Sequence, residues 1–83
     1  MEENLEIGGL YEYTSQHRTA IWLDGSNTTE LNSLGTGDLF VLLEYSNRTE
    51  KEKNFLICKG LFVKTGLIGG FVCYRSELQL KVE

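Results

Sequence analysis

The shortness of the apolar runs is the feature that most constrains how this sequence folds. Each run is bounded by Gly, Asn, Asp or Ser, and the chain has nine glycines and no proline. Short runs that end in turn-forming residues predict β-strands joined by turns. No segment has a convincing helical period, and 83 residues leave room for one domain. We therefore expect a single small all-β domain.

The runs predict five or six strands, which lie at residues 9–13, 19–23, 39–45, 54–64, 67–74 and 78–82. The run at 39–45 is apolar nearly throughout, so we expect it to be buried on much of both faces. The last run alternates, with Leu78, Leu80 and Val82 on one face, as in a sheet with one solvated side. Closing into a small barrel buries such strands without exposed edges. The domain would span residues 9–83, after an acidic N-terminal tail at 1–8.

Turn-forming and polar residues predict the connections between these strands. Residues 24–27, Asp-Gly-Ser-Asn, predict a tight turn, and the glycines within 35–38 permit a sharp reversal. Residues 46–53 are polar and charged, and they predict a loop. We also expect a single 3₁₀ turn at residues 75–77, between the last two strands.

The two cysteines have two alternative interpretations. A two-residue turn at Thr65-Gly66 would place Cys58 directly opposite Cys73, where a disulfide is conceivable. A bulge at residues 59–60 would break that register. We favour two reduced thiols that pack as small core hydrophobes. A zinc site needs about four ligands, and two cysteines with the single His17 are too few.

The order of these pieces resembles the SH3 fold. Leu10-Tyr11-Glu12-Tyr13 is similar to the ALYDY strand of SH3 domains, and residues 30–44 resemble their diverging turn and following strand. Gly70-Phe71-Val72 stands where those domains have a Gly-aromatic-aliphatic triplet. The resemblance implies a five- to six-stranded SH3-like barrel, with residues 14–32 as the RT loop and 46–53 as the n-Src loop.

Two departures from the SH3 pattern bear on ligand choice. Peptide-binding SH3 domains begin their third strand with Trp, where this sequence reads Lys53-Asn54-Phe55-Leu56. Those domains also have a Pro and a Tyr after the triplet, and here Cys73-Tyr74-Arg75-Ser76 follows. Tyr11, Tyr13 and Tyr74 are left to line the usual groove, which argues against recognition of proline-rich peptides.

A second resemblance is to short SH3-like proteins of tailed phages. Like them, this sequence combines Leu10-Tyr11, Ile21-Trp22-Leu23, a Gly-Asp-Leu-Phe-Val-Leu-Leu-Glu strand at 37–44 and a Gly-containing hairpin at 63–69. That resemblance implies an accessory protein that acts on a host or phage protein.

Charge and hydropathy disfavour several partners. The net charge is −4, and Arg48, Lys51 and Lys53 alternate with Glu50 and Glu52, so no basic face for a phosphate backbone is indicated. No apolar run is long enough to span a membrane, and the N-terminus lacks the apolar region of a secretory signal. We expect a cytoplasmic protein without membrane contact, in the host cytoplasm if phage-encoded.

No residue pattern indicates catalysis. His17 sits in a polar loop with no nucleophile placed beside it by a known catalytic pattern, and the acidic residues fit turns or the SH3-like pattern. We therefore expect a non-enzymatic protein-binding module without cofactor, whose candidate binding residues are Tyr11, Tyr13, Trp22 and Tyr74. For Trp22, a core cap is the favoured alternative to a surface position. Other functions that stay open are oligomeric assembly through residues 78–82 and weak nucleic-acid binding through Arg48, Lys51, Lys53, Lys59 and Lys64.

Overall fold

A computed structural model describes residues 5–23 and 32–81, and these form one antiparallel sheet of seven strands. In sequence order the elements are β1 (Leu10–Tyr13), β2 (Thr19–Leu23), β3 (Asn32–Leu34), β4 (Leu39–Glu50), β5 (Lys53–Phe62), β6 (Ile68–Cys73), the 3₁₀ helix Arg75–Glu77 and β7 (Leu78–Leu80). Across the sheet the order is β3-β2-β6-β5-β4-β1-β7. The predicted turn at 24–27, the start of the predicted tail and Val82 lie outside the described residues.

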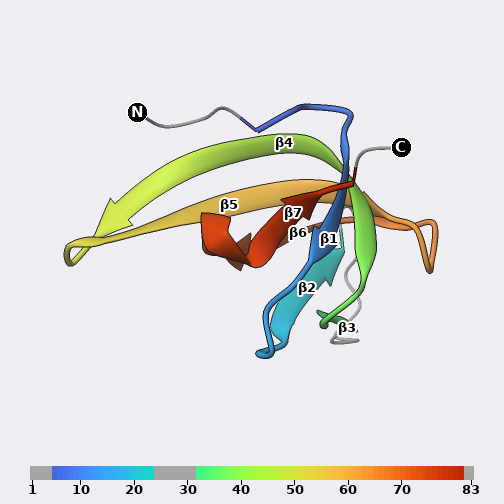
Figure 1. Cartoon of the computed structure of the whole chain (residues 1–83), viewed down its shortest axis with the longest axis horizontal. Coiled ribbons are helices and arrows are strands. Elements are labelled where there is room, and N and C mark those ends of the chain that lie inside the picture. Colours follow the sequence, from blue (N-terminus) through green and yellow to red (C-terminus); the bar gives the residue numbers. More distant parts are fainter. Residues whose placement is uncertain (1–4, 24–31, 82–83) are drawn as a thin grey trace.

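The sheet curls on itself, and the long strands β4 and β5 arch over the shorter ones (Figure 1). This arrangement confirms the all-β class and the 3₁₀ turn at 75–77. The count of five or six strands is wrong, because β3 also pairs with β2. Asn-Ser-Leu is too short and too polar to show a strand pattern, so the sequence placed it in a loop.

A bulge bends β4 where the strand passes over the core. The pairing with β5 shifts at Leu43, so that Leu42 faces Gly60 while Glu44 faces Lys59. An extra residue of this kind bends a strand and increases its twist. The bulge therefore lies on β4, opposite the residues 59–60 where the sequence had suggested one. It allows β4 to pair with β1 at its start and to follow β5 along its length.

The core fills the concave side of the curled sheet. Its fully buried centre is Phe40, whose ring meets Phe71 edge-on at 5.0 Å between centroids and stacks with Tyr11 at 6.0 Å. Around it lie the other buried apolar side chains: Tyr13, Ile21, Leu34, Leu42, Leu56, Cys58, Phe62 and Cys73. The strand at 39–45 is fully buried on this face alone, since Val41 and Leu43 on the other face stay half-buried.

Residues 5–8, which the sequence analysis assigned to the tail, contact the sheet. The Leu5 side chain packs against the core, and its backbone N–H donates to the Tyr45 hydroxyl oxygen at 3.2 Å. The Gly8 N–H donates to the Leu42 carbonyl at 2.7 Å. Residues 5–8 therefore belong to the fold, through hydrogen bonds that the sequence Leu-Glu-Ile-Gly does not signal.

The loop predicted at residues 46–53 is instead a two-stranded arm. Strands β4 and β5 pair out to Glu50 opposite Lys53, and only Lys51 and Glu52 form the turn. Both turn residues have positive φ, 51° and 67°, as primed two-residue hairpin turns require. The arm projects from the body of the sheet (Figure 1). Both faces of the arm are exposed to solvent, and its side chains at 46–53 are polar. This polarity is the reason that the sequence predicted a loop there.

The register predicted for the β5–β6 hairpin is also wrong. The connection is longer than Thr65-Gly66: Leu61 pairs with Ile68, and the Gly66 N–H donates to the Phe62 carbonyl at 2.7 Å. This shifts the pairing by two residues, so Cys58 faces Phe71 instead of Cys73. A two-residue shift leaves every side chain on the same face. Both cysteines therefore stay in the core as free thiols, as favoured from the sequence.

Candidate functional site

The convex face of the sheet carries a group of apolar side chains that the core does not use. Because side chains alternate along a strand, the residues between the core positions of β2, β5 and β6 point outward. The outer patch, as we call it, consists of Trp22, Phe55, Ile57, Val72 and Tyr74. Trp22 is 53% exposed, Tyr74 46% and Val72 38%, and Val72 pairs directly with Ile57 across β5 and β6.

Trp22 lies on Gly70, its cross-strand partner in β6. A Cβ built on Gly70 would stand 2.5 Å from the indole Nε1 and Cε2, so only glycine leaves room for the ring. The indole therefore packs against the backbone of β6 at Gly70, while more than half of the Trp22 surface is in solvent. Of the two alternatives for Trp22, the core cap is wrong, because neighbouring Ile21 takes the inward position on β2.

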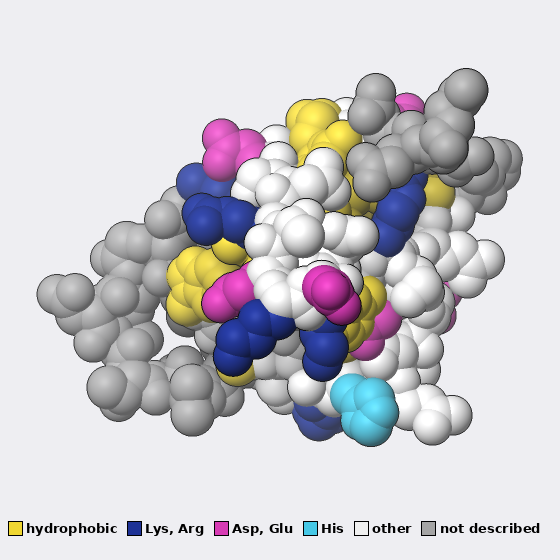
Figure 2. Space-filling view, turned by 90° about the vertical axis from the view of Figure 1, so that its left-hand side faces the viewer, with side chains coloured by type: hydrophobic (Ala, Val, Ile, Leu, Met, Phe, Trp, Pro, Cys, Tyr) yellow, Lys and Arg dark blue, Asp and Glu magenta, His cyan; other side chains and the backbone are white. Residues whose placement is uncertain are grey.

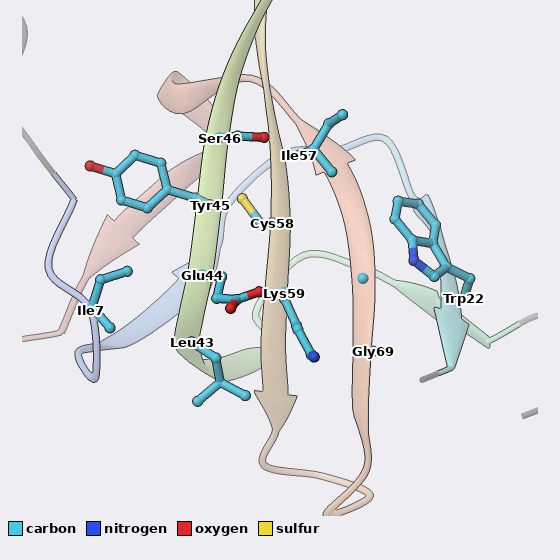
Figure 3. A pocket seen from close by; sticks show the side chains of 11 residues that line it. Ile7, Trp22, Leu43, Glu44, Tyr45, Ser46, Ile57, Cys58, Lys59 and Gly69 are labelled. Carbon is cyan, nitrogen blue, oxygen red and sulfur yellow. The ribbon is translucent and has the colours of Figure 1, made fainter. Parts of the chain in front are cut away.

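Beside Trp22 lies a shallow open hollow of about 650 Å³ across β2, β6, β5 and β4. Figure 3 shows Trp22 at one side of these strands and Tyr45 at the other, with Lys59 and Glu44 between them. Glu44 and Lys59 are cross-strand neighbours on this face. A mainly apolar surface with a few charged groups set into it suits a protein segment that needs a fixed orientation.

A second hollow of about 290 Å³ continues the outer patch toward the 3₁₀ helix. Phe55, Val72 and Tyr74 line it, together with the exposed loop residues His17 and Arg18. Because Val72 lines this hollow and its partner Ile57 lines the first, the two hollows meet at that pair. The result is one apolar surface that runs from Trp22 to Tyr74.

The structure separates the four predicted binding residues into two pairs. Trp22 and Tyr74 are exposed on the outer patch, whereas Tyr11 is 4% and Tyr13 1% exposed. Tyr11 and Tyr13 are not part of the exposed patch, because β1 turns both rings into the core, although Tyr13 also lines the second hollow. Only their hydroxyls reach polar partners: the Tyr11 oxygen accepts from the Glu6 N–H at 2.8 Å.

Tyr13 is buried, but it is among the residues that line the second hollow. Its hydroxyl donates to the His17 carbonyl at 2.7 Å, and Glu77 Oε2 lies 3.3 Å away. Burial, with the negative charge of Glu77, raises the pKa of the Tyr13 phenol despite a bond with Ser15. The phenol therefore stays protonated around neutral pH and ties the loop at His17 to the 3₁₀ helix.

The sequence analysis missed Phe55, Ile57 and Val72 as outward residues. A signal for them exists: in β5 the core residues Leu56 and Cys58 alternate with Phe55 and Ile57, so both faces of the strand are apolar. An antiparallel strand of this kind needs a cover on each face. The core covers one face of β5, and the outer patch lies on its other face.

Within residues 5–23 and 32–81, no three His, Cys, Asp or Glu side chains lie together as metal ligands. A hydrogen bond with Cys58 and burial raise the pKa of the Cys73 thiol, so this thiol stays protonated. In the same ranges, no helix has the length and hydropathy needed to cross a bilayer.

The charges on the arm face are mixed in sign. Figure 2 shows Lys and Arg side chains beside Asp and Glu side chains on the side from which the arm projects. Glu50 pairs across the turn with Lys53, and both are exposed. On this face of the described residues, the positive side chains alternate with negative ones and do not form an extended track.

Comparison of the sequence and its structure with protein-family models, curated proteins and solved structures finds no match. The assignment of a function therefore rests on the geometry of the protein itself.

Proposed function

We propose that this protein is a non-enzymatic protein-binding module whose binding surface is the outer patch. The observation that carries the proposal is the exposed Trp22, held over Gly70 and continuous with Ile57, Val72 and Tyr74. Large aromatic side chains dominate the energetics of protein interfaces. A contiguous apolar area on a small domain is typical of an interaction site.

The proposed fold is an SH3-like barrel. Its support is the connectivity: β1 lies between β4 and β7, β4, β5 and β6 form a meander, and a 3₁₀ turn precedes β7. The segment between β1 and β4, which resembles an RT loop, contributes β2 and β3. Four of the five outer-patch residues, all except Tyr74, lie on strands of this barrel.

The proposed partner is a folded or extended protein segment with an apolar face. A proline-rich peptide is not proposed, because Phe55 replaces the usual Trp of SH3 grooves and Tyr13, which would line such a groove, is buried. On the resemblance to phage proteins, the partner is a host or phage protein met in the host cytoplasm.

Replacement of Trp22 with alanine tests this proposal. Tagged wild type and Trp22→Ala are used to capture partners from host lysate, and bound proteins are quantified by mass spectrometry. We expect a partner retained by wild type to be weakened at least about tenfold by Trp22→Ala, the loss typical of an interface hot spot. The thermal unfolding midpoint of each variant is measured first, to show that both are folded.

Val63→Ala is the matched control for this experiment. Val63 is 55% exposed, as Trp22 is, but it lies in the β5–β6 connection away from the patch. It should retain the partner. Equal capture by wild type and folded Trp22→Ala, or the same loss in Val63→Ala, would contradict the assignment of the outer patch.

A further inference from the structure

A third cavity, of about 400 Å³, lies apart from the outer patch and shares none of its five residues. It is bounded by the 35–38 turn, by β2 and β3, and by the end of the β5–β6 hairpin. Its floor is apolar, since Ile21, Leu34 and Phe62 are all at most 6% exposed. The size falls within the range of small-ligand sites.

The rim of this cavity is polar and carries two positive charges, Arg18 and Lys64. Hydroxyl groups stand between them, from Ser33, Thr36 and Thr65. Neither cation forms an ion pair in the part of the protein that the structure describes. In a protein of net charge −4, two cations around one cavity that form no ion pair within residues 5–23 and 32–81 are a local exception.

The guanidinium of Arg18 is held in place before any ligand arrives. Its Nε donates to Ser33 Oγ at 2.8 Å, and among the residues that the structure describes neither Nη group has an acceptor. Its carbon Cζ lies 3.1 Å from where a Cβ on Gly35 would stand, so the group rests on bare backbone. A fixed guanidinium loses less conformational entropy when it binds an anion.

One carboxylate also lines the cavity, but the fold already uses it. Asp38 Oδ2 accepts the Gly35 N–H at 2.8 Å and closes the 35–38 turn, and the Asp38 N–H donates to the Gly35 carbonyl at 3.0 Å. Arg18 forms no ion pair with it. The rim therefore keeps an excess of one positive charge.

We propose that this cavity binds an apolar carboxylate, with the carboxylate between Arg18 and Lys64 and the apolar group on Phe62 and Leu34. Arginine binds carboxylates through two parallel N–H bonds, and its free Nη groups supply both donors. The apolar floor selects against small inorganic anions, which gain nothing from Ile21 or Leu34. This site shares none of the five outer-patch residues, although Arg18 also lines the second hollow.

The test is an NMR titration of the ¹⁵N-labelled full-length protein with N-acetyl-L-leucine. Its neutral amide, N-acetyl-L-leucinamide, is the matched control for the carboxylate, and inorganic phosphate is the control for the apolar group. We expect saturable shifts of the Gly35, Thr36 and Phe62 amides with the acid, weakened as ionic strength rises. Equal shifts with the amide, stronger shifts with phosphate, or no shifts with the acid would overturn the proposal.

Variants locate the anion contact. Arg18→Gln should raise the Kd for N-acetyl-L-leucine about tenfold. Gly35→Ala should act in the same direction with Arg18 intact, because the new Cβ would stand 2.9 Å from Nη1 and displace the guanidinium. Arg48→Gln, on the exposed arm, should bind as wild type does. Wild-type affinity in Arg18→Gln, or an equal loss in Arg48→Gln, would overturn the assignment.

The C-terminal carboxylate of a polypeptide and a free organic acid share this chemistry, and two more probes separate them. A tripeptide that ends in leucine is compared with isovalerate under the same conditions. Tighter binding of the peptide assigns the site to the C-terminus of a partner protein. Tighter binding of isovalerate assigns it to a small acid, and binding of neither would overturn the site.

Discussion

Phe71→Ala is expected to leave much of the protein unfolded at 25 °C. Phe71 is fully buried, and its ring meets those of Phe40 and Phe62 at 5.0 Å and 5.9 Å between centroids. Truncation of a buried phenylalanine costs about 3–5 kcal/mol, through lost burial and the cavity left behind. A domain of this size has a free energy of unfolding of about 5 kcal/mol. The variant should therefore lose most of its stability.

Urea unfolding followed by circular dichroism measures this loss, with Val72→Ala as the matched control. Val72 is the next residue in the same strand, but its side chain points outward and is 38% exposed. Its truncation should cost less than about 1 kcal/mol. If Phe71→Ala lost no more stability than Val72→Ala, the two faces of β6 would be assigned the wrong way round.

Gly69→Ala has the second largest expected effect, since it forces two strands apart. Gly69 pairs with Leu23 in β2 and with Gly60 in β5. A Cβ on Gly69 would stand 2.6 Å from the Trp22 carbonyl oxygen, which is backbone and cannot rotate away. Strand β2 would have to shift, at a cost of about 1–3 kcal/mol typical of overpacking.

Gly70→Ala is the comparison for Gly69→Ala, because its new Cβ would clash with a side chain and not with the backbone. The atoms within 2.7 Å of its new Cβ belong to the Trp22 indole, which is half in solvent and can swing out. We expect a smaller loss of stability than in Gly69→Ala, with a change in tryptophan fluorescence. Urea unfolding of both variants checks the order, and a larger loss in Gly70→Ala would contradict the inference that the indole can move away from the new Cβ.

The sequence predicts the strands whose pattern comes from the core. Runs such as 19–23 and 39–45 carry large apolar residues at alternate or successive positions, and both became strands. Two elements escaped prediction: β3 is a three-residue edge strand whose one core residue is Leu34, and the arm at 46–53 is polar on both faces. Hydrophobic periodicity reports burial, so a strand with one buried side chain or none leaves no such signal.

The candidate site was predictable only in part, because residue type does not say which way a strand faces. Tyr11 and Trp22 are both aromatic and both lie in short strands, yet one is buried and the other exposed. The strand register decides which of the two is exposed. Trp22 pairs with Gly70, which has no side chain to cover the indole, whereas Tyr11 pairs with Phe40 in the core. Register depends on the bulge at Leu43 and on the length of the β5–β6 connection. Neither follows from the local sequence.

The most direct test of the outer patch as a protein-binding surface is acrylamide quenching of tryptophan fluorescence. Trp22 is the only tryptophan in the sequence, so the signal reports on this residue alone. Quenching is measured for the free protein and again in complex with a partner captured by wild type but not by Trp22→Ala, using a partner fragment without tryptophan. We predict strong quenching in the free protein and clear protection in the complex. A Trp22 already protected in the free monomer, or quenched equally in the complex, would contradict the account.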